Sequence, residues 1–514
     1  MRSILLFQKK PQPDPGQHSF SKRSSDLTPD STPFPKEALT RPRTTLLFKK
    51  KPRPDPGQHY FSKRSPDLTP DNTAFPKEAS KTPLTIQLIQ KHTATSLLGC
   101  IFHFYPPKPF AFKSAFYLCG MKQTLIENKG LPASLLWALA IIAGITVANL
   151  YYNQPLLYNI SQDLQVSEFK TNLIAMVTQI GYALGLLFII PLGDLFPRRK
   201  IILVNFSILI LSLLSIALSP NLEFILLASF FTGLCSIMPQ IFIPIAAQFS
   251  TPETKGKNVG IIVSGLLTGI LGSRVVSGIV GEIMGWRFMF FAAAVLMILS
   301  CVFLLRVMPD IQSNFEGKYK DLMKSLLQLV KDYPVLRVSA LRAGLAFGSF
   351  LALWSCLAFR MEQAPFYAGS HVTGLLGLCG VAGAMTASFV GRYVRKVGVK
   401  RFNYIGCGLI LLAWICLSYW GDTYAGIISG ILLFDVGMQC IQLSNQTTIF
   451  SLNPKASNRI NTIFMTTYFA GGSLGTFLAG SFWSLYGWNG VVGAGLLLIG
   501  CSFLLNLFFR KEIA

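Results

Sequence analysis

The sequence predicts an all-α polytopic membrane protein, with twelve transmembrane helices in two pseudo-symmetric six-helix bundles behind a disordered N-terminal extension. Three observations predict this fold: an apolar composition, twelve apolar segments and an internal repeat. Hydrophobic residues make up 51% of the 514 residues and charged residues only 13%, whereas a soluble domain carries about 25% charged residues. This deficit of charge indicates a chain that lies mostly in a bilayer.

Twelve apolar segments approach or exceed the roughly 20 residues that cross a bilayer as a helix. The first six are Ala133–Leu156, Asn172–Leu192, Ile201–Leu218, Phe224–Phe249, Val259–Met284 and Phe288–Val307. The second six are Val338–Phe359, Val372–Val390, Phe402–Tyr419, Tyr424–Phe450, Ile463–Leu485 and Val491–Phe509. The polar stretch Met308–Arg337 lies between them, and within it Phe315–Leu329 has an amphipathic helical pattern. We therefore expect a first bundle over 121–307, a linker over 308–337 and a second bundle over 338–514.

An internal repeat relates the two sets of six. Residues Pro252, Lys257, Gly269, Gly278, Gly285 and Trp286 recur 202 positions later as Pro454, Arg459, Gly471, Gly480, Gly487 and Trp488. Two matched halves in a polytopic membrane protein are typical of a transporter that rocks around a site between the halves.

Residues 1–120 have a different composition. Segments 5–38 and 46–79 are near-copies at an offset of 41 residues, rich in Pro, Lys, Ser and Asp. Because they show no helical or strand period, they predict disorder. Met121 opens a short polar segment before the first long apolar run, so our hypothesis is that Met121 is the functional start and that residues 1–120 are dispensable.

The charge distribution predicts the orientation. Basic residues of the membrane part gather in alternate loops, which places those loops and both termini in the cytoplasm. These residues are Arg198, Arg199, Lys200, Lys255, Lys257, Lys318, Lys320, Lys324, Lys331, Arg392, Arg395, Lys396, Lys400, Arg401, Lys455, Arg459, Arg510 and Lys511. The net charge of +23 forms no stripe with interleaved aromatic residues, so we expect no nucleic-acid partner.

Signs of an enzyme are absent from the sequence. The ten cysteines form no CxxC pair, and of the five His only His371 is in the membrane part, so no metal site is expected. The spans carry no nucleophile–base constellation. No GxxxxGK[ST] loop is present, so the chain has no ATP-binding domain of its own. We expect no cofactor.

Two loops carry a family resemblance. IPLGDLFPRRK follows the second span, with Asp194, Arg198, Arg199 and Lys200, and GRYVRKVGVKR follows the eighth. On these loops, the chain resembles the major facilitator superfamily, specifically its twelve-helix bacterial proton-linked efflux branch. The resemblance implies a monomer in the bacterial cytoplasmic membrane that exports a small molecule in exchange for protons. Asp194 and the three cations would then form a cytoplasmic gate.

The first loop departs from the family pattern at Ile190, Leu195 and Pro197, and Ser229 stands where the family has a helix-4 Arg. Uptake of a sugar or organic acid by the same fold stays open as an alternative. A membrane-embedded receptor or enzyme is a weaker third possibility.

Two charges lie deep in the predicted spans, where a charge costs at least about 2.5–3.5 kcal/mol and normally has a partner. Arg274 and Asp435 are each roughly 15 Å from the outer end of their span. They have opposite signs and belong to different halves. Our hypothesis is an inter-half pair that breaks during transport, and local capping of polar groups is the alternative. Glu223, Glu282 and Arg342 lie near span ends, where snorkelling explains them.

Polar and aromatic side chains gather on a few spans. In the family, helices 1, 4, 7 and 10 line the central cavity. The resemblance therefore implies these lining residues: Asn149, Tyr152, Asn153, Gln154, Gln240, Trp354, Gln439, Gln442, Asn445 and Gln446, with Gln179 on helix 2 as a further candidate. An aromatic belt at the membrane interface is the alternative for Tyr152.

Overall fold

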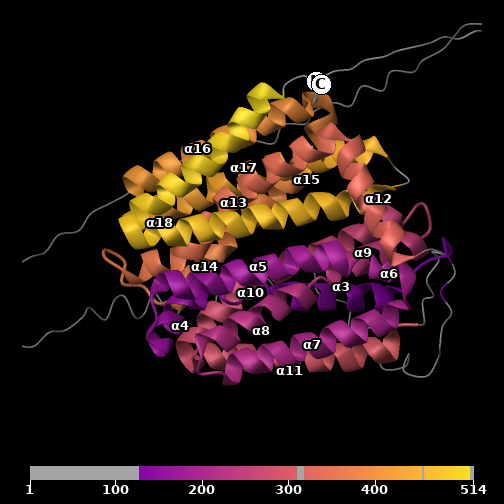
Figure 1. Ribbon diagram of the computed structural model, residues 1–514, viewed down its shortest axis with the longest axis horizontal. Helices are drawn as coiled ribbons and strands as arrows, with labels where there is room; N and C mark the ends of the chain where they lie inside the picture. The colour runs from indigo at the N-terminus through magenta and orange to yellow at the C-terminus, as the bar shows by residue number, and fades with distance from the viewer. Residues whose placement is uncertain (1–124, 126, 310–317, 454–455, 510–514) are drawn as a thin grey trace, which may run out of the picture. The chain divides into compact units, whose positions relative to one another are not determined.

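The computed structural model describes residues 125, 127–309, 318–453 and 456–509. All of these fall within one compact unit, Thr93–Ala514, and they form helices and connecting turns without any strand (Figure 1). The predicted disorder of residues 1–120, the hypothesis on Met121 and part of the linker lie outside the described residues.

The first half runs from α3 to α11. Its helices are α3 (Ala133–Ala148), η2 (Gln154–Leu156), α4 (Leu157–Leu164), α5 (Glu168–Phe188), α6 (Leu192–Leu195), α7 (Arg198–Leu218), α8 (Leu222–Cys235), α9 (Pro239–Phe249), α10 (Lys255–Met284) and α11 (Trp286–Val307). The first predicted span is therefore broken after Ala148, and the fourth is broken before Pro239. Proline at the first position of α9 has no N–H to donate, so the break fits that residue.

The second half follows an amphipathic linker helix, α12 (Tyr319–Asp332). Its helices are α13 (Pro334–Glu362), α14 (Ser370–Leu376), η3 (Gly377–Cys379), α15 (Gly380–Val397), α16 (Val399–Trp420), α17 (Tyr424–Leu452) and α18 (Ser457–Phe508). The predicted helix at Phe315–Leu329 is thus found a few residues later.

Ten helical segments are long and apolar enough to cross a membrane, and α3 is a shorter apolar helix. The 52 residues of α18 would extend about 78 Å, more than twice the hydrocarbon thickness of a bilayer. Gly487 interrupts this helix with a non-helical backbone, φ +57°, and so separates the eleventh and twelfth predicted spans. Counted in this way, the described helices account for all twelve predicted spans.

The 202-residue repeat has a structural meaning. Gly285 and Gly487, its paired glycines, both have positive φ, which L side chains rarely adopt, and both mark the end of one span and the start of the next. Gly269 packs against the α3 backbone at Gly144, and its counterpart Gly471 packs against the α13 backbone at Gly344. A Cβ atom at either position would overlap the facing backbone, so the two halves are built around equivalent close helix pairs.

The second pair of repeat glycines joins the halves to each other. Gly278 on α10 lies against the backbone of Ser370 on α14, and Gly480 on α18 lies against the side chain of Asn172 on α5. The halves therefore pack through two symmetric helix pairs, α10 with α14 and α5 with α18. The second pair runs side by side across the middle of Figure 1.

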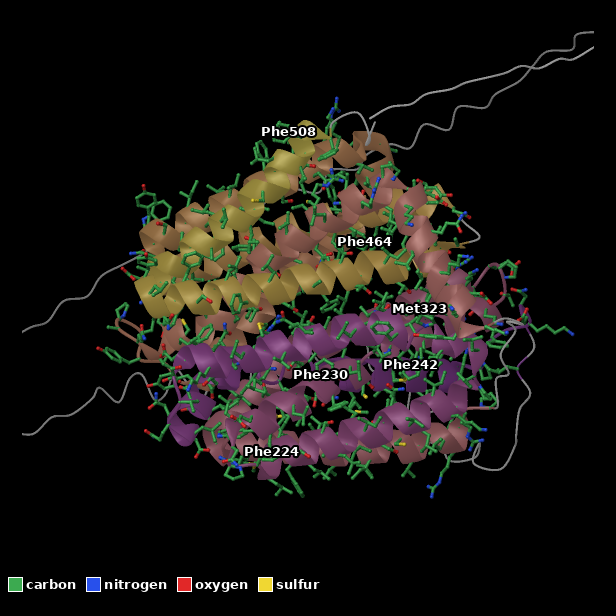
Figure 2. The ribbon with its side chains drawn as sticks, in the orientation of Figure 1. Phe224, Phe230, Phe242, Met323, Phe464 and Phe508 are labelled. Carbon is green, nitrogen blue, oxygen red and sulfur yellow. The ribbon has the colours of Figure 1, made fainter. Side chains whose placement is uncertain are left out.

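The outward surface of each half is apolar. Phe224 is 62% exposed and Phe508 is 77% exposed, whereas Phe242 and Phe464 are completely buried (Figure 2). Aromatic and aliphatic side chains are exposed along most spans, where they suit contact with lipid tails. Exposure to lipid costs an apolar side chain no hydrophobic free energy, because the tails are as apolar as it is. The polar side chains discussed next are found inside.

Candidate functional site

The polar residues of the first span form the broken end of α3. After Ala148 the chain turns through Asn149 to Asn153 and enters η2, with Pro155 in its first turn. Asn149, Tyr152, Asn153 and Gln154 are all buried. The Oδ1 atoms of Asn149 and Asn153 are buried without a hydrogen-bond partner among the described residues. Buried amide oxygens normally accept a hydrogen bond. These two oxygens are therefore acceptors that the described side chains leave unused inside the bundle.

Arg274 is held by both halves. Only 3% of it is exposed. Its Nε–H donates to Gln154 Oε1 at 2.9 Å, a contact within the first half. Its guanidinium carbon lies 4.0 Å from the ring centroid of Trp354, on α13 of the second half, and 5.1 Å from that of Tyr151. Cation–π contact with Trp is the strongest of this kind, so Arg274 bridges the halves through an aromatic ring.

Asp435 on α17 is 8% exposed, and in the described part of the chain its Oδ2 has no hydrogen-bond partner. Within that same part, no ion pair joins Asp435 to Arg274. Both charges nevertheless pack against one stretch of the second half. Gly377 lies against the Arg274 side chain, and Gly380 and Gly383 lie against Asp435. One helical turn of about 5 Å separates these contacts.

The amides of α9 and α17 have protein partners. Gln240 lies within hydrogen-bonding reach of the Tyr182 hydroxyl. Gln442, its counterpart in the repeat, accepts a hydrogen bond of 3.1 Å from the Tyr468 hydroxyl, and Gln446 contacts Met465 Sδ at 3.8 Å. Gln240, Gln442 and Gln446 are partly exposed, as is Gln439.

Asn445 belongs to a different cluster. It is fully buried, and its Oδ1 accepts from Arg342 Nε at 3.1 Å. A second amide, Asn506 Oδ1, accepts from Arg342 Nη1 at 2.7 Å. Arg342 is itself 0% exposed, so the snorkelling explanation for it was wrong. Its position along α13 is near the helix start, but its side chain points into the second bundle, and position along a span does not reveal which way a side chain faces.

Opposite ends of the molecule differ in how the halves meet. We call the end that carries α12 the linker end and the other the far end. At the far end, Glu282 of α10 accepts from the Ser370 N–H at 2.9 Å and from the Ser370 hydroxyl at 3.1 Å, and it lies 3.6 Å from His371 Nδ1. Glu282 therefore does more than reach toward water as a snorkelling residue.

The α5–α18 contact closes the same end. Asn172 Nδ2 donates to the Thr476 carbonyl at 2.8 Å, and the Thr476 hydroxyl donates to Gln179 Oε1 at 3.1 Å. The Trp483 indole N–H donates to Glu168. Neither Asn172 nor Thr476 was singled out from the sequence. The repeat could have pointed to Thr476, because Thr476 occupies the position equivalent to Arg274.

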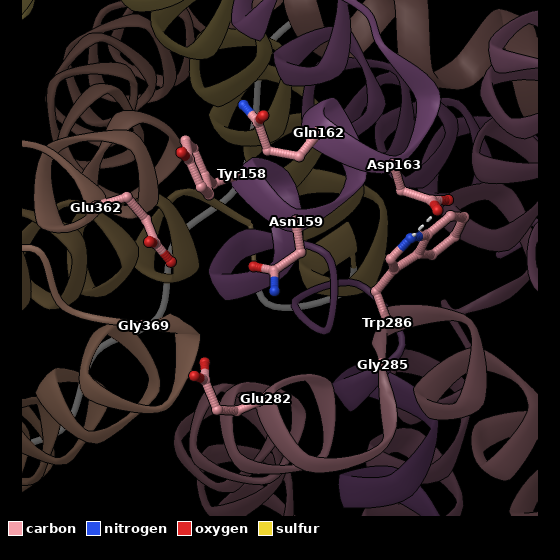
Figure 3. A pocket seen from close by; sticks show the side chains of 9 residues that line it. All are labelled: Tyr158, Asn159, Gln162, Asp163, Glu282, Gly285, Trp286, Glu362 and Gly369. Carbon is pink, nitrogen blue, oxygen red and sulfur yellow. Dashed lines mark hydrogen bonds between the residues drawn. The ribbon is translucent and has the colours of Figure 1, made fainter.

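A pocket opens at the far end, with a volume of about 540 Å³. Its walls come from both halves: Tyr158, Asn159, Gln162, Asp163, Glu282, Gly285, Trp286, Glu362 and Gly369. Glu282 and Glu362 project into the same space from different helices (Figure 3). The Trp286 indole N–H donates to Asp163 Oδ2 at 3.3 Å, and Asp163 also pairs with Arg287.

At the linker end, Arg199 Nη2 donates to the Leu305 carbonyl at 2.6 Å, a contact within the first half. Lys200 is exposed and Arg198 is partly buried, and the side chain of Asp194 lies outside what the structure describes. The hydroxyl of Tyr319 on α12 donates to the Phe188 carbonyl at 3.1 Å, and partial burial raises the pKa of this phenol. The linker helix thus contacts the end of α5.

The described side chains offer no candidate metal site. Among the described residues, no group of three or more His, Cys, Asp or Glu side chains could hold a metal ion.

Comparisons with known proteins decide the family. Residues 136–476 match the family model described as Major Facilitator Superfamily. The chain belongs to this superfamily. It is a membrane transporter of that superfamily, whose members carry small-molecule substrates.

Relatives and solved structures agree with this family. The chain is 36% identical over 389 residues to "Uncharacterized transporter YgaY" of Escherichia coli O157:H7, which covers 75% of this chain and 99% of that protein. It is 28% identical to "Probable transporter SCO4007" of Streptomyces coelicolor, over 70% of this chain and 84% of that one. A mutant of the nucleoside transporter NupG has the same fold, with a TM-score of 0.60 at 13% identity over 74% of this chain and 100% of that one.

Proposed function

We propose that this transporter exports a small molecule across the bacterial cytoplasmic membrane, as a monomer, in exchange for protons and by alternating access. One observation carries the proposal. Arg274 and Asp435 are buried opposite charges of different halves, they pack against neighbouring turns of one stretch of the second half, and they form no direct pair in the described chain. Two such charges can change partners when the halves rock.

Asp435 is our candidate for the proton carrier. A buried carboxylate without a partner is costly and prefers to be protonated, whereas a nearby cation favours its ionised form. Movement of α10 relative to α17 changes the distance between the guanidinium and this carboxylate. The protonation of Asp435 would then depend on the state of the transporter, which is what coupling to a proton gradient requires.

Orientation follows from the loop charges. The linker end carries Arg198, Arg199 and Lys200 and the basic side chains of α12 and its surroundings, so we assign it to the cytoplasm together with both termini. The contact of Gly278 on α10 with Ser370 on α14 lies at the far end, which we assign to the opposite side of the membrane.

The cytoplasmic gate is proposed on sequence resemblance and location. Asp194 follows α5 within the short helix α6, and Arg198 to Lys200 begin α7. A carboxylate and cations at adjacent helix ends can hold the two halves together until the loop moves. The side chains lining the cavity between the halves are proposed to be Asn149, Tyr152, Asn153, Gln154, Gln179, Gln240, Trp354, Gln439, Gln442 and Gln446. Asn445, predicted from the sequence to line the same cavity, is not among them, because its amide binds Arg342 and Asn403 inside the second bundle.

Everted membrane vesicles with an acidic interior test the function. An antiporter that exports its substrate would release protons from the vesicles when that substrate is added outside, and a pH-sensitive dye would report the release. A panel of dyes, sugars and amino acids should contain compounds that give this signal with the native chain and not with Asp435→Asn. Substrate-driven proton entry, in right-side-out vesicles only, would instead support the alternative, an uptake symporter for a sugar or organic acid.

A charge swap tests the pair itself. Arg274→Asp and Asp435→Arg should each abolish transport, and the double variant should recover part of it. Recovery of nothing would contradict the inter-half pair and leave local capping as the role of each charge.

A further inference from the structure

The site between the halves offers unused binding capacity of two opposite kinds. Arg274 uses its Nε–H on Gln154, and in the described part of the chain its two Nη groups have no protein acceptor. Asp435 Oδ2 has no donor there. A guanidinium with free Nη groups is suited to bidentate binding of a carboxylate, and a buried carboxylate oxygen is suited to an ammonium group.

The two charges are kept apart by other contacts. The guanidinium is sandwiched near the rings of Trp354 and Tyr151, and the Gln154 amide holds it from the first half. Its side chain contacts Gly377, one turn away from the contact of Asp435 with Gly380. A group that carries both a negative and a positive charge, separated by only a few ångströms, would satisfy both side chains at once.

A row of aromatic side chains starts at Arg274, with Trp354 against its guanidinium. The ring centroids of Trp354 and Phe350 are 6.3 Å apart, and those of Phe350 and Phe434 are 6.2 Å apart. The Phe434 ring also packs against Trp414 inside the second bundle, 5.1 Å between centroids. Because Trp354 and Tyr151 lie against the guanidinium, a ligand held by Arg274 would place its body beside these rings, which favours a hydrocarbon side chain.

We infer that the site binds a zwitterion with an apolar body, of the apolar α-amino acid class, with its carboxylate on Arg274 and its ammonium group on Asp435. The inference rests on the proposed function, because it names the substrate class of the same site. It also explains why the two charges do not pair with each other among the described contacts, since a permanent Arg274–Asp435 pair would occupy both binding groups.

Three matched compounds test the inference by equilibrium binding to the purified full chain in detergent, without any gradient. The probes are L-leucine, 4-methylpentanoate, which lacks the amine, and 3-methylbutylamine, which lacks the carboxylate. Binding is measured by calorimetry at mildly alkaline pH, at which Asp435 and the carboxylate and ammonium groups of the probes are ionised. Leucine should bind at least about tenfold more tightly than either analogue, the difference expected from losing one charged contact. Phenylalanine and methionine should also bind.

Two variants assign the charges to the two side chains. Asp435→Asn should bind leucine and 4-methylpentanoate equally, because the ammonium group no longer has its partner. Arg274→Gln should bind leucine and 3-methylbutylamine equally. Asp422→Asn and Arg287→Gln make the same chemical changes at more exposed far-end positions and should keep the native preference. Equal binding of the three probes by the native chain, or no binding of any of the amino acids, would overturn the inference.

Binding and transport results separate the two proposals. Selective leucine binding without proton-coupled flux would support the zwitterion-binding site and contradict proton-coupled transport. Proton-coupled flux of other compounds without selective binding would sustain the transporter proposal and contradict the zwitterion.

Discussion

Arg342 shows how much depends on the direction of one side chain. It is a fully buried cation whose partners are the amides of Asn445 and Asn506, without a carboxylate among its described contacts. Its backbone carbonyl also accepts from the Ser502 hydroxyl at 3.0 Å. These contacts join α13, α17 and α18, so we regard Arg342 as the polar centre of the second bundle.

Arg342→Ala should therefore destabilise the protein strongly. The change leaves two buried amide oxygens without donors, each costing about 1–3 kcal/mol, and creates a cavity. Thermal unfolding of the purified protein should shift to a clearly lower temperature. Arg306→Ala, at an exposed position on α11, is the matched control and should have little effect. Equal stability of both variants would show that the buried network is dispensable.

At the scale of elements, close approach of helices decides where glycine is required. Gly269 and Gly471 occupy equivalent positions in two helix pairs, whereas Gly272, one turn from Gly269, faces open space. The sequence presents these glycines as equally small residues in one apolar stretch. Only the packing tells which of them lie against another backbone.

Alanine at Gly269 or Gly471 should destabilise the protein by about 1–3 kcal/mol, because the added methyl group forces two helices apart. Gly272→Ala should be neutral or slightly stabilising, since alanine is the better helix former. Thermal unfolding of the three variants checks this. A loss at Gly272 as large as at the other two would mean that helix packing is not the cause.

Glu282 joins α10 to the start of α14 through Ser370, and a Cβ atom at Gly369 would displace its carboxylate. Gly369→Ala should therefore loosen the far end. The reporter is Ser277→Cys, a buried position, in a background without the native cysteines. A membrane-impermeant maleimide should label this cysteine several-fold faster in the Gly369→Ala variant. Gly256→Ala, which meets nothing within 4 Å, should leave the rate unchanged. An unchanged rate in Gly369→Ala would show that the bonds from Glu282 to Ser370 do not hold the far end closed.

Much of the fold could be predicted, because the hydropathy pattern and the repeat each extend over many residues of the sequence. The twelve spans, the linker helix and the equivalence of the halves all follow from such patterns. Side-chain direction could not be predicted, as Arg342 shows, because a helix buries one face and exposes another within the same few residues. The Arg274–Trp354 contact was equally hidden, since it depends on how two halves meet and no local pattern records that meeting.

For the whole molecule, alternating access requires the far end to open, and one pair of residues allows a direct test. A Cβ atom at Gly480 would lie 3.4 Å from the Asn172 Cβ, near the range of about 3.5–4.5 Å that disulfides span. Asn172→Cys with Gly480→Cys, in a background without the native cysteines, should therefore form a disulfide between the halves on mild oxidation. Transport should stop and return on reduction, while each single variant should be insensitive to oxidant. Because the link holds only the far end, the oxidised protein should still bind substrate from the linker end. Transport that continues while the disulfide is intact would show that the halves do not separate there, and the rocking of two matched bundles would have to be replaced by a smaller, local movement.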